Sequence, residues 1–219
     1  MAIRLFIVLL FVGSCFFFYP FESYSASDHI RELAGRIILQ TEKNGEAWYV
    51  TPEKGEKYYL GRPRNALEIM IKFGTGISEE NLAKIPVGIL SKKGKDQDND
   101  GLIDDLEKAL GTDPDNPDTD KDGYNDKTEI SQNYSPTDSG KLPVDNNFAA
   151  NHAGKIFLQT EKNGEAWYIN PKDGKRYFLH RPDRAFSLMK KLSIGITNKD
   201  FQNIPFASDS KKVKEPREE

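Results

Sequence analysis

The chain contains 219 residues, of which 30% are charged and 37% are hydrophobic, and its net charge is −3. This length predicts one or two domains, and the single cysteine excludes a disulfide within the chain. The charge is unevenly distributed, because residues 96–129 carry a net charge of −10 and the remainder carries +7. A block this acidic must stay solvated or recruit cations, and it argues against nucleic acid as a partner.

The N-terminal segment predicts export. Arg4 precedes an apolar run from Leu5 to Phe21, and small residues follow at the expected cleavage positions. Residues 1–26 therefore have the pattern of a signal peptide, which predicts a secreted or cell-surface bacterial protein. Membrane attachment is expected only by two alternative routes. The apolar run, although shorter than the about 20 residues that span a bilayer, could stay uncleaved, or Cys15 could be lipidated, since the residues before it loosely resemble a lipobox.

An internal duplication dominates the remaining sequence. Gly35–Pro86 recurs as Gly154–Pro205 at a constant offset of 119 residues, without gaps. The run from Leu39 to Tyr49 returns unchanged in the second copy. One small fold used twice is the simplest explanation, and we expect the two module copies to occupy residues 35–90 and 152–207.

Each copy begins with a pattern of β-strands. In the first copy, strand-like residues at 37–41 and 47–50 flank Asn44-Gly45, a strong hairpin signal. A third strand-like segment follows at 57–60. We therefore expect a three-stranded antiparallel meander in each copy.

A helical period replaces the strand pattern after the third strand. A proline opens this segment, and apolar residues that include Met70 recur at the spacing of one helix face. Gly74 predicts the end of this helix, and a second short helix is expected over residues 79–84 and 198–203. These elements predict an α+β fold in which two copies of a β-meander-plus-helix module are joined by the acidic segment.

Aromatic residues of the meander have two interpretations. They supply the core of a small domain, or they form an open shelf that stacks on sugars, as in the choline-binding wall repeats that they weakly resemble. Burial of Tyr49 and Tyr168 would exclude the shelf. The candidate ligand-binding residues are Trp48, Tyr49, Tyr58, Trp167, Tyr168 and Tyr177.

The acidic segment matches the twelve-residue EF-hand calcium loop, first from Asp96 to Glu107 and again 22 residues later from Asp118 to Glu129. Calcium takes six to eight oxygen ligands. Positions 1, 3 and 5 supply carboxylates, position 7 a backbone carbonyl, position 9 a direct or water-mediated ligand, and position 12 a bidentate glutamate, while glycine at position 6 allows the turn. The predicted Ca²⁺ ligands are Asp96, Asp98, Asp100, Leu102, Asp104, Glu107, Asp118, Asp120, Asp122, Tyr124, Asp126 and Glu129.

A regular EF-hand also needs a helix entering each loop, and the residues before Asp96 have no helical period. Only the exiting helix, Ile103 to Leu110 with Gly111 as its cap, is expected. The sequence from Asp105 to Asp118 resembles the bacterial thrombospondin type 3 repeat. This resemblance, over residues 96–139, implies an extracellular calcium-binding array that acts as a spacer between modules.

These patterns together predict a non-enzymatic, calcium-binding structural or adhesion protein, in which a calcium-stiffened connector holds two like modules. Cell-wall glycan or another surface protein is the expected partner. The three histidines and the lone cysteine show no zinc-type or catalytic-triad spacing. The charged segment from 208 to 219 predicts a disordered tail.

Overall fold

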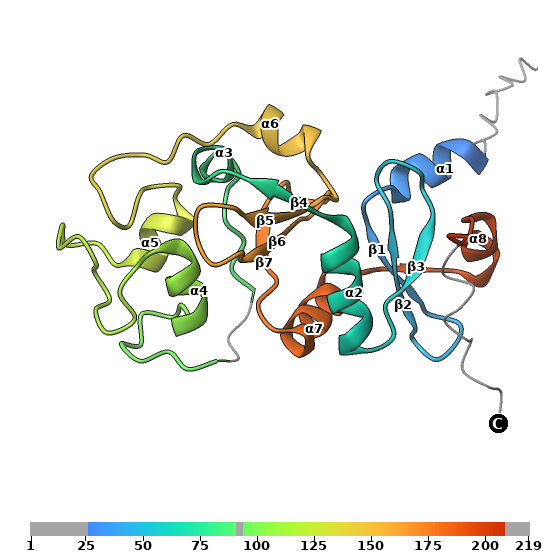
Figure 1. The fold of residues 1–219 in the computed structure, drawn as a ribbon, viewed down its shortest axis with the longest axis horizontal. Helices are drawn as coiled ribbons and strands as arrows, with labels where there is room; N and C mark the ends of the chain where they lie inside the picture. Colours follow the sequence, from blue (N-terminus) through green and yellow to red (C-terminus); the bar gives the residue numbers. More distant parts are fainter. Residues whose placement is uncertain (1–25, 91–93, 209–219) are drawn as a thin grey trace, which may run out of the picture.

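The computed structural model describes residues 26–90 and 94–208 (Figure 1). The predicted signal peptide, with Cys15, lies outside the described residues apart from Ala26, and the predicted tail lies outside them apart from Ser208. None of the described helices is long and apolar enough to cross a membrane.

The described chain is an α+β fold, as predicted, and the two copies have the same order of elements. The first copy comprises α1 (Ala26–Leu33), β1 (Ile37–Gln40), β2 (Ala47–Val50), β3 (Lys57–Tyr59), α2 (Pro63–Phe73), β4 (Gly74–Ile77) and α3 (Glu79–Ala83). The acidic segment contains α4 (Asp104–Leu110) and α5 (Asp126–Ser131). The second copy comprises α6 (Asn146–Asn151), β5 (Ile156–Gln159), β6 (Ala166–Ile169), β7 (Arg176–Phe178), α7 (Pro182–Leu192), β8 (Ile194–Ile196) and α8 (Asn198–Asn203).

Each copy donates its fourth strand to the sheet of the other copy. The expected antiparallel meanders are present, but β8 adds to β1 in parallel and β4 adds to β5 in parallel. The resulting orders are β3-β2-β1-β8 and β4-β5-β6-β7. Gly74 ends α2, as predicted, but its φ of −64° and ψ of 125° are those of extended backbone, because it is also the first residue of an exchanged strand.

The two sheets enclose α2 and α7, which pack against each other in the centre of the molecule (Figure 1). The central core between the sheets contains residues of both copies, including the buried Met70 and Met189. Ala47 and Tyr49 of β2 face this core, whereas Trp48 lies in a separate cluster on the outer face of its sheet. Successive side chains of β2 thus point to opposite faces of the sheet and contribute to two cores, one on each face.

The backbones of the two copies meet at Gly35 and Gly154, where a Cβ on Gly154 would lie 2.2 Å from the Cα of Gly35. Two buried tyrosines form reciprocal hydrogen bonds at this contact. The Tyr49 hydroxyl donates to the Gly154 carbonyl at 2.8 Å, and the Tyr168 hydroxyl donates to the Gly35 carbonyl at 2.7 Å. Glycine is needed at both positions because any side chain would separate the copies.

Two buried cations hold the exchanged segments in place. Lys57 Nζ donates to the carbonyl of Phe201 in α8 at 2.6 Å, and Arg176 Nη1 donates to the carbonyl of Leu82 in α3. Each cation therefore binds a carbonyl near the C-terminus of a helix from the other copy, where the helix dipole favours positive charge. Burial lowers the pKa of Lys57 to about 8 and that of Arg176 to about 10.

The identical hairpins of the two copies also bind the exchanged segments. A carboxylate oxygen of Glu42 accepts from the backbone N–H of Asn198 at 2.8 Å, and one of Glu161 accepts from that of Glu79 at 3.0 Å. Both acceptors lie at the first residue of an exchanged helix, where free N–H groups need partners. The exchange thus explains the presence of Glu42 and Glu161, which a simple hairpin would not require.

We expect Gly154→Ala to lower the free energy of unfolding by about 2–4 kcal/mol, because it adds a backbone clash to left-handed strain. Gly164→Ala is the matched control, since Gly164 has a similar φ of +78°, against +81° for Gly154, but no atom within 4 Å of its virtual Cβ. The control should lose only about 1 kcal/mol. Urea unfolding in excess calcium measures both, and equal losses would contradict the close contact between copies.

Candidate metal centre

The acidic segment forms a lobe, residues 94–145, that follows the first copy in sequence and precedes the second. Before the lobe, the Gly88 N–H donates to the Arg176 carbonyl of β7 at 2.8 Å. At its end, the Asp145 N–H donates to the carbonyl of Lys84, next to α3, also at 2.8 Å. Both ends are thus fixed to one half of the molecule, and α4 and α5 lie at that end of it (Figure 1).

The lobe packs on the outer face of the sheet β4-β5-β6-β7. Its apolar residues share one core with Trp167 of that sheet and with the exchanged α3. The lobe residues buried there are Leu102, Ile103, Leu106, Ala109 and Ile130. Because the modules also exchange strands, the expectation of two separate modules held apart by a spacer does not fit this arrangement.

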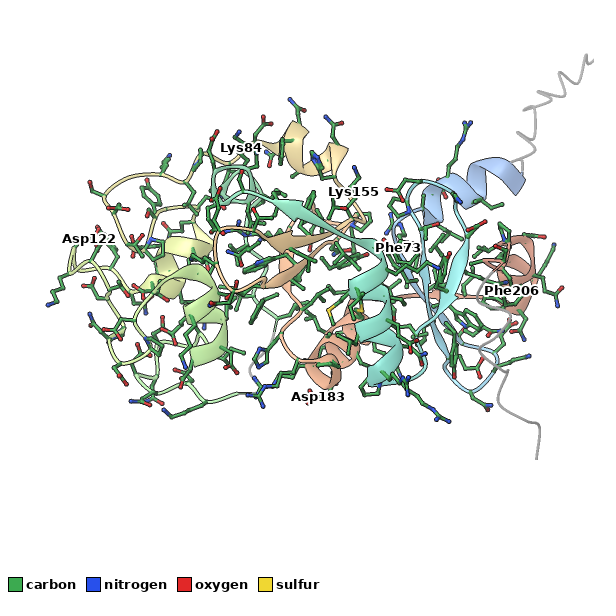
Figure 2. All side chains as sticks on the ribbon, in the orientation of Figure 1. Phe73, Lys84, Asp122, Lys155, Asp183 and Phe206 are labelled. Carbon is green, nitrogen blue, oxygen red and sulfur yellow. The ribbon has the colours of Figure 1, made fainter. Side chains whose placement is uncertain are left out.

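Both predicted loops have the same backbone conformation. Positions 4 and 6 have positive φ in each, at Asn99 (63°) and Gly101 (95°), and at Lys121 (65°) and Gly123 (98°). A glycine at position 6 suits this turn because a side chain is disfavoured there. The second loop (Asp122 is labelled in Figure 2) therefore repeats the first, as its sequence predicts.

Hydrogen bonds inside each loop orient the carboxylates. In the first loop, Asp98 Oδ1 accepts from the Asp100 N–H at 3.1 Å, and Asp100 Oδ1 accepts from the Leu102 N–H at 2.6 Å. In the second loop, Asp120 and Asp122 accept the equivalent bonds at 3.1 and 2.9 Å. These bonds leave other oxygens of the loop aspartates, including the buried Asp98 Oδ2, without a hydrogen-bond partner.

The carboxylates at positions 1, 3 and 5 converge in both loops. One oxygen from each of the three aspartates lies within 4.8 Å of the other two. Calcium–oxygen distances are about 2.3–2.6 Å, so ligands on opposite sides of an ion are about 5 Å apart. The converging sets are Asp96, Asp98 and Asp100, and Asp118, Asp120 and Asp122.

The glutamates at position 12 provide the second observation for a cation. Glu107 is 0% exposed and Glu129 is 6% exposed, and neither Glu107 oxygen nor Glu129 Oε2 has a hydrogen-bond partner. Asp96 Oδ1, Asp98 Oδ2 and Asp118 Oδ1 are likewise buried without one. Buried, unpaired carboxylate oxygens are costly unless a cation compensates them, so these residues fit a bound Ca²⁺.

The electrostatic environment of the two glutamates also favours a bound cation. Burial raises the pKa of Glu107 to about 7, and the charges of Asp98 and Asp100 add to the effect. Burial likewise raises the pKa of Glu129 to about 7, with further contributions from Asp120 and Asp122. Each of these glutamates therefore lies among like charges, which a bound cation would offset.

Position 9 has a different role from the converging carboxylates. Asp104 Oδ1 accepts from the Gln97 N–H at 3.0 Å, and Asp126 Oδ1 accepts from the Thr119 N–H at 2.8 Å. Asp126 Oδ2 also accepts from the Thr119 hydroxyl at 2.7 Å. These aspartates therefore fix the start of each loop, which favours the water-mediated option for position 9.

At position 7, the two predicted carbonyl ligands come from residues in different settings. Leu102 is buried in the core beneath the lobe, whereas the side chain of Tyr124 is exposed. Only the backbone carbonyl is required at this position. The side chain is thus free to serve packing in the first loop and to face solvent in the second.

The two loops contact each other. The Lys127 N–H, at the start of α5, donates to Asp100 Oδ2 at 3.3 Å. The negative charge of Asp126 also contributes to the raised pKa values of Asp100 and Glu107. Occupation of one site should therefore affect the other, a link that the separate motifs did not predict.

The sequence interpretation missed the polar contact that attaches the lobe to α7. Asp105 Oδ2 lies 2.8 Å from Arg184 Nη1 and 3.0 Å from His180 Nε2. In the first copy, Asn65 corresponds to Arg184 and Gly61 corresponds to His180. This departure between otherwise similar copies is the signal that could have identified the contact.

The aromatic candidates for glycan binding lie in the cores. Tyr49, Tyr168 and Tyr177 belong to the central core, Trp48 and Trp167 to the outer ones, and Tyr58 packs against the central core. With Tyr49 and Tyr168 buried, the open shelf needed for sugar stacking is absent from the described meanders. This corrects the expectation that these six residues bind a ligand.

Comparison of the chain with protein-family models, with curated proteins and with solved structures found no match. The likeness of residues 96–139 to the thrombospondin type 3 repeat therefore rests on the sequence from Asp105 to Asp118 together with the loop motifs. The geometry of the loops carries the functional interpretation.

Calcium affinity should rise with pH, because Glu107 and Glu129 must lose protons to bind the ion. With folded-state pKa values near 7, the apparent affinity of each site should increase about tenfold from pH 6 to pH 8.

The folding stability of the calcium-free protein should show the opposite trend with pH. Its folded state holds these protons more tightly than the unfolded chain, so stability falls as the pH rises from about 4.5 to about 7. Calcium titrations and urea unfolding across this range test both trends, and a flat affinity profile would contradict the raised pKa values.

Proposed function

We propose that this protein is a calcium-binding structural or adhesion protein of the cell exterior, whose acidic lobe binds two Ca²⁺ ions. The observation that carries the proposal is the repeated geometry of the loops. Each brings three carboxylates together and closes on a buried glutamate with unpaired oxygen. Side-chain and carbonyl oxygens without nitrogen or sulfur ligands suit a hard cation.

Calcium fits these loops better than magnesium does. Calcium accepts six to eight oxygens in flexible geometry, including both oxygens of one glutamate, whereas magnesium demands near-ideal octahedral coordination and keeps several waters. Each loop offers more protein oxygens than magnesium usually takes. Extracellular calcium modules bind in roughly the 0.1–1 mM range, which is consistent with the proposed export of the chain.

The proposed role of calcium is to hold the lobe on the second copy. In α4, Glu107 faces the first loop while Leu106 and Ala109 lie in the core shared with Trp167. Neutralising the loop therefore removes the electrostatic cost of packing this helix against the sheet. We assign the lobe to stabilisation of one face of the molecule, with no catalytic step.

Calorimetry should give two calcium ions per chain. We expect Glu107→Gln to weaken the first site by at least tenfold, because a charge and a bidentate oxygen pair are lost together, and Glu129→Gln to weaken the second. Asp138→Asn is the control, since it removes one charge from an exposed position of the same lobe outside both loops and should leave the stoichiometry at two. Zero stoichiometry in the wild type, or equal binding in all three variants, would overturn the proposal.

Removing calcium should loosen the lobe and leave the strand-exchanged centre intact. Hydrogen exchange of backbone amides in α4 and α5 should become faster in chelator, because binding stabilises only the folded lobe. Amides of α2 and α7 should keep their protection, since the central core includes no lobe residue. Uniform loss of protection in all four helices would show that calcium stabilises the whole molecule, and no change in α4 and α5 would show that the lobe folds without it.

A further inference from the structure

An apolar groove lies between α2 and the β5–β6 hairpin, and none of its lining residues belongs to the acidic lobe. It encloses a cavity of about 400 Å³, a volume within the range of binding pockets. Met70, Leu158 and Phe178 are among the residues that line it. On its α2 side, Leu67 is 40% exposed and Ile71 is 70% exposed, so apolar surface continues along the helix.

The second copy has different residues at the corresponding positions of α7. At the constant offset of 119 residues, Leu67 corresponds to Phe186 and Ile71 to Lys190. Phe186 is partly buried against the central core, and Lys190 Nζ lies 5.6 Å from the centre of its ring. One fold thus accepts an aromatic ring with an adjacent cation on α7, where α2 offers a smaller leucine and an exposed isoleucine.

A carboxylate at the groove has an unsatisfied oxygen. Glu165 belongs to the lining, and its Oε1 accepts from Asn163 Nδ2 at 3.1 Å. Its Oε2 is buried and has no hydrogen-bond partner. A buried acceptor without a donor is costly, and a cationic donor would both pair this oxygen and balance its charge.

We propose that this groove binds a segment of a partner protein that inserts an aromatic side chain beside Leu67 and places a basic side chain near Glu165. The ring and cation that the second copy supplies from its own helix would here come from the partner. A protein segment fits better than a small molecule, because the exposed surface of Ile71 extends beyond the cavity and an occupant must run along α2 to cover it.

Variants that copy the second module into the first test this proposal. Leu67→Phe fills the groove from within, and Ile71→Lys supplies the cation beside it. Both residues already occur at the matching positions of α7, so the fold tolerates them there. The variants should keep the thermal stability and two-ion calcium binding of the wild type.

The probe is the blocked dipeptide N-acetyl-Phe-Lys-amide, titrated into calcium-loaded protein and followed by NMR of the methyl groups of Met70 and Leu158. We expect saturable shifts in the wild type and at least a tenfold loss of affinity in Leu67→Phe. N-acetyl-Ala-Lys-amide should not bind measurably, and N-acetyl-Phe-Glu-amide should bind several-fold more weakly. Glu165→Gln should reduce this preference for lysine over glutamate.

The proposal fails if wild type and Leu67→Phe respond equally, or if the shifts leave Met70 and Leu158 unaffected. It also fails if the lysine and glutamate probes bind alike to the wild type. A folded Leu67→Phe variant, established by its melting temperature and its calcium stoichiometry, ensures that lost binding reflects a filled groove. Since the melting temperature shows the variant to be folded even if the calcium stoichiometry is zero, the result does not depend on the proposed calcium function.

Discussion

The reciprocal exchange of β4 and β8 is the constraint on which the remaining structure depends. Neither meander has its parallel fourth strand without the other copy. Because α2 directly precedes β4 and α7 directly precedes β8, the exchange brings the two helices together between the sheets. The exchanged α3 and α8 then cover the outer faces, so the exchanged segments contribute to both outer cores.

The acidic lobe adds an electrostatic condition to the packing of one outer face. Its helix α4 must bury Leu106 against the sheet and Glu107 inside the first loop. The apolar contact favours docking, whereas the desolvated carboxylates oppose it. The proposed cation would resolve this conflict, since it would compensate the loop charge while leaving the apolar contact in place. Arg184 and His180 then fix the register of α4 on α7 through Asp105.

The parts of the fold and of the candidate site that were predictable from the sequence are those determined by local signals. Asn-Gly hairpins and the twelve-residue loops both act over a few residues. The exchange was not predictable, because Gly74–Ile77 is glycine-rich, lacks strand alternation and pairs with residues about 80 positions away. The docking of the lobe likewise depends on tertiary contacts that no loop motif encodes.

Comparison of the two copies separates residues that the fold requires from those that serve one copy alone. A buried cation is present in both, as Lys57 and Arg176, because each exchanged helix needs a donor near its C-terminus. His180 instead corresponds to a glycine, and it lies where only the second copy meets the lobe. Leu67 corresponds to a phenylalanine, and it borders the groove of α2. Because one fold accommodates both residue types at such positions, the differences between the copies follow what each copy contacts. The acidic lobe is one such contact already present within the chain.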